Sequence, residues 1–162
     1  MLNLFIPFFI ALILSGPTVY AQETKLSIKK ITLEGLREKI LENKGKVLIL
    51  DFWATYCAPC KEEIPFLNEL YQTYRDKGLE VIGISIEGAG EDVIRPFVEM
   101  MRISYPIFLG GDDIIEAYDI QYIPLTYIVG KDGRVRMKEM GFKKEVSIPK
   151  FKRQIEELLK EG

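Results

Sequence analysis

The strongest hydrophobic pattern in the chain is the run 47–53, which is apolar except for Asp51. Seven such residues are enough for one strand buried on both faces. A short turn with Cys57 and Cys60 follows, and apolar side chains then recur every three or four residues over 58–77. That spacing is typical of one face of a helix. The pattern therefore predicts a central strand that leads directly into a helix.

The rest of the chain alternates between short strands and helices. Helical spacing begins just after Thr32, a suitable N-cap, and the dipeptide Asp132-Gly133 is a turn that would join the last two strands. The expected strands are 26–31, 79–86, 105–109, 125–129 and 135–140, and the expected further helices are 33–42, 91–101, 112–118 and 148–160. Such an order predicts an α/β sandwich with a central mixed β-sheet flanked by helices.

Composition limits the domain count and the type of partner. The chain has 162 residues, 48% of them hydrophobic, which suits one domain with its own core. The net charge is −2, and basic and acidic side chains are interleaved along the sequence. A nucleic-acid-binding domain ordinarily carries a concentrated basic patch. We therefore expect a single domain and no nucleic-acid partner.

The first 21 residues differ from the rest because none of them is charged. A short apolar stretch, 4–14, is broken by Ser-Gly-Pro and followed by Val-Tyr-Ala, a small-residue cleavage pattern that ends at Ala21. This is the layout of a secretory signal peptide, although no Lys or Arg precedes the apolar stretch. We expect cleavage near Ala21 and an exported domain, periplasmic or otherwise extracytoplasmic, over 22–162.

Retention of this segment as a membrane anchor is the alternative. The apolar stretch is short and broken for a membrane span. If it stayed, the charge bias from Lys25, Lys29 and Lys30 would favour a domain on the inside of the membrane. No cysteine lies near the leader, so the sequence excludes a lipoprotein anchor.

Cys57 and Cys60 are the two cysteines of the chain, and they are three positions apart. A zinc site needs about four ligands, and the chain has no histidine and no further cysteine. The same lack of histidine argues against a copper site. A static structural disulfide is possible, but closing so small a loop removes little chain entropy. The remaining interpretation is a redox pair.

The predicted strand-to-helix turn favours that redox interpretation. The first N–H groups of a helix lack partners and its N-terminus is electropositive, which would stabilise a thiolate at Cys57 and lower its pKa. Cys60, one turn further into the helix, could then attack a mixed disulfide on Cys57 and release the partner protein.

Two carboxylates are candidates for proton transfer. Asp51 lies in an otherwise apolar strand, where a buried carboxyl keeps its proton and could exchange it with Cys60. The alternative is that Asp51 faces solvent on an edge strand. Glu63 lies three residues after Cys60 on the same helix face, or it is simply an exposed acid next to Glu62. If both acids lie near the cysteines, their titrations are coupled.

These residues resemble a known family. Asp51-Phe52-Trp53-Ala54, followed by Cys57-Ala58-Pro59-Cys60-Lys61, is similar to the active-site strand and turn of the thioredoxin superfamily. The longer run 52–65 looks more like the TlpA/ResA branch of exported thiol–disulfide oxidoreductases, whose helix-plus-strand insertion matches residues between Ile86 and Ile123. A second match covers 122–133. The resemblance extends over about residues 30–160 and implies a thioredoxin-like sandwich.

The second match contains Ile123 and Pro124. In the family the equivalent proline is cis and stands against the cysteine pair, whereas without the resemblance a trans proline at a strand start would be expected. Two residues depart from the family pattern: Tyr56 stands where Trp is common, and Leu125 where Thr is usual. The resemblance thus implies a partner-contacting surface formed by Trp53, Tyr56, Pro59, Ile123 and Pro124.

The function implied by the resemblance is exchange of protein disulfides. Cys57 would attack, Cys60 would resolve, and Asp51 and Glu63 would handle protons, with no cofactor and no metal. The partners would be protein thiols and disulfides, with apocytochrome c as one family example, and a membrane electron donor. Two rivals stay open: a non-catalytic binding module with a static disulfide, and a peroxiredoxin, whose Pro and Thr pattern is absent around Cys57.

Overall fold

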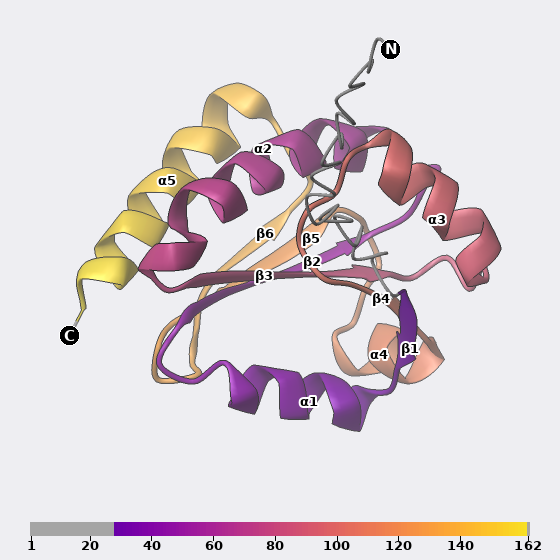
Figure 1. Ribbon diagram of the computed structural model, residues 1–162, viewed down its shortest axis with the longest axis horizontal. Helices are drawn as coiled ribbons and strands as arrows, with labels where there is room; N and C mark the ends of the chain where they lie inside the picture. The colour runs from indigo at the N-terminus through magenta and orange to yellow at the C-terminus, as the bar shows by residue number, and fades with distance from the viewer. Residues whose placement is uncertain (1–27, 162) are drawn as a thin grey trace, which may run out of the picture.

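The computed structural model describes residues 28–161 (Figure 1). Helices and strands alternate along the chain, as the hydrophobic pattern predicts. In order, the elements are β1 (Lys29–Ile31), α1 (Leu33–Glu42), β2 (Val47–Trp53), α2 (Ala58–Tyr74), a 3₁₀ turn η1 (Arg75–Lys77), β3 (Leu79–Ser85), α3 (Glu91–Met100), β4 (Ile107–Gly110), α4 (Asp112–Ala117), β5 (Leu125–Val129), β6 (Val135–Met140) and α5 (Lys144–Lys160).

One mixed β-sheet runs through the molecule, with strand order β1-β4-β3-β2-β5-β6. The pairs β1–β4, β4–β3 and β3–β2 are parallel, whereas β2–β5 and β5–β6 are antiparallel. β2 is therefore an interior strand with a parallel neighbour on one side and an antiparallel neighbour on the other. This sheet flanked by helices is the predicted architecture.

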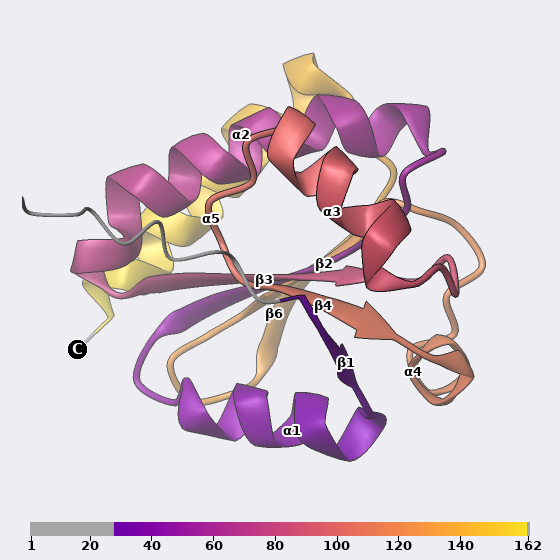
Figure 2. The same ribbon diagram turned by 45° about the vertical axis from the view of Figure 1, so that its right-hand side comes forward.

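Helices cover both faces of the sheet. Figures 1 and 2 show α2, α3 and α5 on one face and α1 and α4 on the other. All seven residues of β2 are buried, which explains why its sequence is a nearly continuous apolar run. Alternate β2 side chains point to opposite faces, so Ile49, Asp51 and Trp53 face α2 while Leu48, Leu50 and Phe52 face α1.

The insertion predicted between Ile86 and Ile123 is present as α3, β4 and α4. Its strand, β4, pairs with β3 on one side and with β1 on the other. Its helix α3 packs on the α2 face, where Phe97 stacks on Trp53 with ring centroids 5.1 Å apart. The insertion thus adds the strand β4 to the sheet, and its helix α3 covers part of the β2 face that is turned toward α2.

Several predicted boundaries are wrong. α5 begins at Lys144 rather than at Ile148, because the Ser147 hydroxyl accepts a hydrogen bond from the Lys143 N–H at 3.1 Å and stabilises an earlier first turn. β4 begins at Ile107 rather than at 105. Leu41 and Met100, which lie in predicted helices and are hydrophobic, have exposed side chains.

None of the helices in residues 28–161 combines the length and apolar character needed to cross a membrane. The predicted leader 1–21 lies outside the described residues.

Candidate active site

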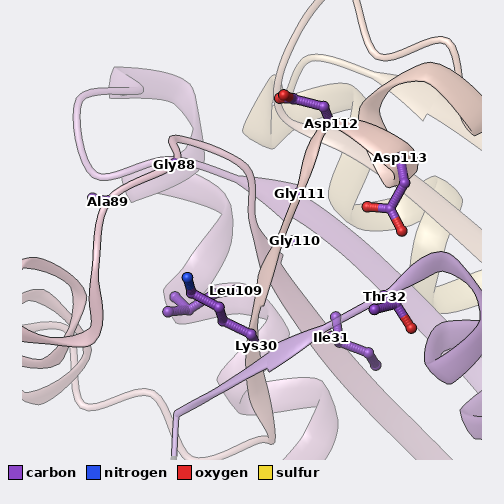
Figure 3. Close-up of a pocket in the computed structure, with 10 residues that line it drawn as sticks. All are labelled: Lys30, Ile31, Thr32, Gly88, Ala89, Leu109, Gly110, Gly111, Asp112 and Asp113. Atoms are coloured by element: carbon purple, nitrogen blue, oxygen red, sulfur yellow. The ribbon is translucent and has the colours of Figure 1, made fainter.

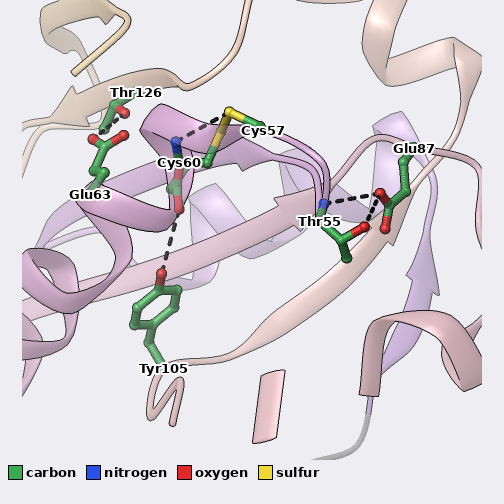
Figure 4. The surroundings of a disulfide bond; sticks show 8 residues. Thr55, Cys57, Cys60, Glu63, Glu87, Tyr105 and Thr126 are labelled. Carbon is green, nitrogen blue, oxygen red and sulfur yellow. Dashed lines mark hydrogen bonds between the residues drawn. A yellow bond between two sulfur atoms is a disulfide. The ribbon is translucent and has the colours of Figure 1, made fainter. Parts of the chain in front are cut away.

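Cys57 and Cys60 lie where β2 gives way to α2, and they form a disulfide (Figure 4). Cys57 is the N-cap of α2, and its Sγ accepts a hydrogen bond from the Cys60 N–H at 3.2 Å. The turn before it is closed by a Cys57 N–H bond to the Ala54 carbonyl. Cys57 is 6% exposed and Cys60 1%, so Cys57 is the sulfur that a partner can reach more easily. This is the strand-to-helix position that the sequence predicts.

Asp51 is buried beneath α2, with 1% of its surface exposed. Because β2 is an interior strand, the alternative of a solvent-facing edge position is wrong. Burial raises the pKa of Asp51 from 3.8 to about 7, and a contact with the Tyr105 hydroxyl, 3.5 Å from Oδ2, opposes that rise. Oδ1 is buried without a hydrogen-bond partner. Asp51 can therefore hold or release a proton near neutral pH.

Glu63 is also buried, at 1% exposure, so the alternative of an exposed helix acid is wrong. It extends from α2 toward β5, where its Oε1 accepts a hydrogen bond of 2.8 Å from the Thr126 hydroxyl (Figure 4). Burial raises the pKa of Glu63 well above 4.5, and the charge of Asp51 raises it further. Its second oxygen, Oε2, is buried without a partner. The two acids thus form an interacting pair in the interior.

The Ile123–Pro124 peptide bond is cis, as predicted. It lies directly before β5, the antiparallel neighbour of β2. Because Leu125 is opposite Phe52 in this pairing, the cis bond lies at the end of β2 that leads to the cysteines. The backbone of Ile123 is therefore close to the redox pair.

The other residues predicted to contact a partner have different environments. Trp53 is completely buried and stacks on Phe97, so it can shape the site only from within the core. Tyr56 is 71% exposed, and Pro59 at the start of α2 is also exposed. Tyr122, which lies just before the cis peptide bond, is 70% exposed.

A shallow apolar groove joins several of these residues. It has a volume of about 490 Å³ and is lined by Tyr56, Ile86, Ile115, Ile120, Gln121, Tyr122 and Ile123. It lies between the turn before Cys57 and the cis peptide bond. A groove with this lining suits an extended apolar segment.

Sequence reasoning missed Tyr105, Thr126 and Gly83, which surround the buried acids. Gly83 is opposite Asp51 on β3, and a Cβ there would lie 2.5 Å from Ile107 and 3.0 Å from Tyr105. The absence of a side chain lets Tyr105 reach Asp51. Thr126 is opposite Asp51 on β5. Gly83 and Thr126 become neighbours of Asp51 through strand pairing, and Tyr105 through the segment before β4. A single sequence contains no direct signal for either arrangement.

Glu87 is a further missed residue, and it braces the turn before Cys57. Its Oε2 accepts hydrogen bonds from the Thr55 N–H at 3.0 Å and from the Thr55 hydroxyl at 2.8 Å (Figure 4). The backbone adds a bond from the Ile86 N–H to the Trp53 carbonyl. The loop after β3 thus fixes the position of the active-site turn.

A separate cavity of about 400 Å³ lies at the carboxyl ends of β1 and β4 (Figure 3). Its lining includes Lys30, Thr32, Gly111 and Asp113. Asp113 is already used structurally, because its Oδ2 accepts a hydrogen bond of 2.6 Å from the Leu33 N–H at the start of α1. No group of three or more His, Cys, Asp or Glu side chains in residues 28–161 is arranged to hold a metal ion.

Comparison with known proteins identifies the family. A family model described as "AhpC/TSA family" matches residues 20–138. The thiol-disulfide oxidoreductase ResA of Bacillus cereus is 33% identical over 166 aligned positions, which cover 93% of this chain and 91% of the relative. ResA of Halalkalibacterium halodurans is 32% identical, with coverage of 74% and 68%.

Solved structures agree with the thioredoxin-like fold. A thiol:disulfide interchange protein of the thioredoxin family from Chlorobium tepidum has a TM-score of 0.65 and 26% identity, and covers 74% of this chain and 83% of that one. StoA from Bacillus subtilis has a TM-score of 0.57 and 22% identity, with coverage of 69% and 86%, and shows the fold alone. The chain therefore belongs to the AhpC/TSA family and is a thioredoxin-like thiol–disulfide oxidoreductase of the ResA type, with Cys57 and Cys60 as its disulfide pair.

Proposed function

We propose that this oxidoreductase reduces disulfides of other proteins outside the cytoplasm. The observation that carries the proposal is the position of the Cys57–Cys60 disulfide at the start of α2, the helix that carries the buried Glu63 and covers the β2 face with the buried Asp51. The helix N-terminus favours a thiolate at Cys57, and the acids can exchange protons with the buried Cys60.

In the proposed cycle the reduced enzyme begins as a dithiol. The Cys57 thiolate attacks one sulfur of the partner's disulfide, and the other partner sulfur leaves as a thiolate that takes up a proton. Cys60 gives its proton to the carboxylate of Asp51 or Glu63, and its thiolate attacks Cys57 Sγ. The S–S bond to the partner breaks, the partner leaves with two thiols, and the Cys57–Cys60 disulfide forms again. An external dithiol then returns two electrons to the pair.

The buried acids also favour a reducing direction. A dithiol becomes strongly oxidising when its surroundings stabilise the thiolate of the reduced form. Here Asp51 and Glu63 place acidic groups in the interior beneath the pair. When these acids are ionised at higher pH, their negative charge opposes ionisation of the Cys60 thiol. We therefore expect a reduction potential nearer to that of a reductant than to that of a disulfide-forming catalyst.

The partner-contacting surface of the proposal combines exposed and backbone groups. Tyr56 and Pro59 flank the cysteines, and Ile123 and Pro124 present the backbone next to them. Trp53 supports this surface from the core. Apocytochrome c is the family example of such a partner, and a membrane electron donor would recharge the enzyme.

Export is part of the same proposal. Residues 1–21 would direct the chain across the membrane, with cleavage near Ala21, and 22–162 would act there as the catalytic domain. Pulse-labelled cells should contain two forms that differ by the mass of the leader, and the shorter form should be extracytoplasmic. A single full-length form inside the cell would contradict this part of the proposal.

The first measurement is the reduction potential of the Cys57–Cys60 pair, by equilibration with dithiothreitol or glutathione. We expect a value below about −200 mV, on the reducing side of protein disulfide isomerase. A value near that of DsbA, about −120 mV, would instead indicate disulfide formation. A pair that cannot be cycled would favour the static-disulfide alternative.

Activity is tested by insulin reduction in the presence of dithiothreitol. The wild-type enzyme should accelerate the turbidity that follows reduction, whereas Cys57→Ser should abolish the acceleration because it removes the attacking sulfur. Cys60→Ser is the matched variant, since it keeps Cys57 but should accumulate the mixed disulfide. Peroxide consumption, measured on the same preparations, separates this activity from that of a peroxiredoxin.

A further inference from the structure

A row of polar side chains crosses the sheet from the buried acids to the surface. Asp51 on β2 is opposite Thr126 on β5, and Thr126 is opposite Glu139 on β6. Residues directly opposite on antiparallel strands project from the same face, with Cβ atoms about 5 Å apart. The three side chains therefore follow one another on the face covered by α2 and α5, and Glu63 joins the row through its hydrogen bond to Thr126.

Exposure increases along this row. Asp51, Glu63 and Thr126 are each 1% exposed, whereas the side chain of Glu139 is 17% exposed. Glu139 Oε2 accepts a hydrogen bond from Nζ of Lys150 on α5, and the Lys150 side chain is 41% exposed. The row thus begins in the dry interior and ends in an ion pair in contact with solvent.

A surface cavity lies between the outer end of the row and Pro59, which belongs to the turn between the two cysteines. It has a volume of about 310 Å³ and is lined by Pro59, Glu139, Met140, Gly141, Phe142, Lys143, Val146 and Ser147. Pro59 is the residue between the two cysteines that directly precedes Cys60. Glu139 and Pro59 of the Cys57–Cys60 turn therefore border the same surface cavity.

The electrostatics of Glu63 indicate that Glu139 is near enough to act on it. The groups that face Glu63 are Asp51 from β2, Thr126 from β5, Glu139 from β6, and Tyr105 from the segment before β4. After burial and the charge of Asp51, the charge of Glu139 is a further cause of the raised pKa of Glu63. Lys150 from α5 offsets the charge of Glu139.

We propose that Glu139, paired with Lys150, is the solvent-side end of a proton path that serves Glu63 and Asp51 during disulfide exchange. The inference rests on the proton roles given to these two acids under the proposed function. The inference adds a route by which these acids regain protons from solvent. A buried carboxyl can act repeatedly only if the proton it gives away is replaced. Glu63 Oε2, buried and without a partner, is the atom that would receive and release it.

Recharging of the enzyme by a dithiol takes two thiol–disulfide exchanges. A donor thiolate attacks Cys57 Sγ, the Cys57–Cys60 bond breaks, and Cys60 leaves as a thiolate. Glu63 or Asp51 gives Cys60 a proton, and the path returns one from solvent through Glu139. The second thiolate of the donor then attacks the donor's first sulfur, which is bound to Cys57. Cys57 leaves as a thiolate and is protonated. The donor loses two electrons and two protons, and the pair gains both.

The test is the rate at which dithiothreitol reduces the pair, in the full domain, followed by rapid quenching and alkylation of the new thiols. The central variant is Glu139→Gln, which keeps the shape of the side chain but cannot carry a proton. We expect reduction about tenfold slower than in the wild type at high dithiothreitol concentration, with a larger solvent isotope effect. The equilibrium reduction potential of Glu139→Gln should stay close to that of the wild type, in contrast to the rate.

Chemical rescue separates a proton path from a structural role. Formate or acetate is small enough to enter the cavity beside Pro59 and can carry the missing proton. Added formate should restore the rate of Glu139→Gln to within about threefold of the wild type. Slow reduction that formate does not restore, with an unchanged isotope effect, would overturn the proposal, and so would a wild-type rate in Glu139→Gln.

Two further variants control for the loss of a charge and for poor folding. Glu145→Gln removes the same charge from an exposed position on α5 and should keep the wild-type rate. Glu139→Gln with Lys150→Gln removes both charges of the ion pair and should be as slow as the single variant, which keeps the test valid if Glu139→Gln alone folds poorly. A wild-type rate in this double variant would overturn the proposal.

The Asp51→Asn, Glu63→Gln double variant tests the underlying proton roles separately. If it reacts slowly while Glu139→Gln reacts normally, the path is wrong and the proposed function stands. If it reacts at the wild-type rate, the proton roles of the acids fail, and the path fails with them.

Discussion

The two faces of β2 have opposite chemistry, although they belong to one strand. Toward α1 and α4, the strand contributes Leu48, Leu50 and Phe52 to an apolar cluster. Toward α2, alternate residues include Asp51, which lies in the same interior as Glu63 and Thr126. The α1 face of the strand is therefore purely apolar, whereas the α2 face adds ionisable groups to an apolar core, where burial changes their proton affinity.

The buried acids lower the stability of the folded protein on the α2 face of the strand. Burying an acid is unfavourable unless it stays protonated or finds partners. Asp51 Oδ1 and Glu63 Oε2 have none among the described residues. The apolar face and the rest of the α2 core must offset this penalty. Substitutions on the two faces should therefore have different pH signatures.

The largest effect on stability is expected on the apolar face, from Phe52→Ala. Phe52 is fully buried and its ring lies 4.9 Å from that of Tyr118. The truncation should lower the free energy of unfolding by about 3–5 kcal/mol, because it leaves a cavity. Urea unfolding at two pH values measures it. The loss should be equal at both, and a strongly pH-dependent loss would contradict the division between the faces.

Asp51→Asn should act through pH instead. The pKa of Asp51 is raised from 3.8 to about 7, so the folded state binds a proton that the unfolded state releases between these values. Stability due to this group is greatest at low pH and falls as pH rises through this window. From about pH 5 to about pH 8 the wild type should lose about 3 kcal/mol through Asp51.

The Asn variant should lack this part of the decline, since it has no proton to lose. Urea unfolding curves at several pH values are the measurement. Asp76→Asn is a suitable control, because this acid is exposed in η1, the 3₁₀ turn that follows α2. Parallel stability profiles for the wild type and Asp51→Asn would contradict the assignment of Asp51 as a buried proton store.

Thr126→Val should have an intermediate effect. The change keeps the shape of the side chain but removes the hydroxyl that donates to Glu63 Oε1. A buried acceptor left without a partner costs about 1–3 kcal/mol. The loss should be larger at high pH, where more Glu63 is ionised, and chemical denaturation at low and high pH tests this order. A larger loss at low pH would contradict it.

The smallest effect is expected at the start of α1, from Thr32→Ala. The Thr32 hydroxyl accepts a hydrogen bond from the Gly35 N–H at 3.1 Å. Loss of this cap should cost about 1 kcal/mol, with no change in the pH profile or in the reduction potential. Thr32→Ser, which retains the hydroxyl, is the matched control. Equal losses in both variants would show that the cap is not the cause.

Much of the fold could be predicted from the sequence because each element is marked locally. The apolar run of β2, the cap at Thr32 and the turn at Asp132-Gly133 depend on neighbouring residues only. The start of α5 could not be predicted in this way, because Pro149 suggests a later first turn than the one that the hydrogen bond from the Lys143 N–H to the Ser147 hydroxyl stabilises.

The residues of the candidate site also differ in whether a local sequence signal marks them. Cys57, Cys60 and the cis bond before Pro124 lie in contiguous motifs and could be identified from the sequence. The neighbours of Asp51 could not, because Thr126 approaches it through strand pairing and Tyr105 approaches it from the distant segment before β4. Glu87 and Glu139 each look like ordinary polar residues until the strands are placed side by side.

The position of Trp53 has a practical consequence. It is the single tryptophan of the sequence, and it lies buried four residues before Cys57 on the strand that carries Asp51. All indole emission of this protein therefore originates at one point next to the redox centre. The chain carries its own optical probe, and the progress of thiol exchange can be followed in real time without any attached label.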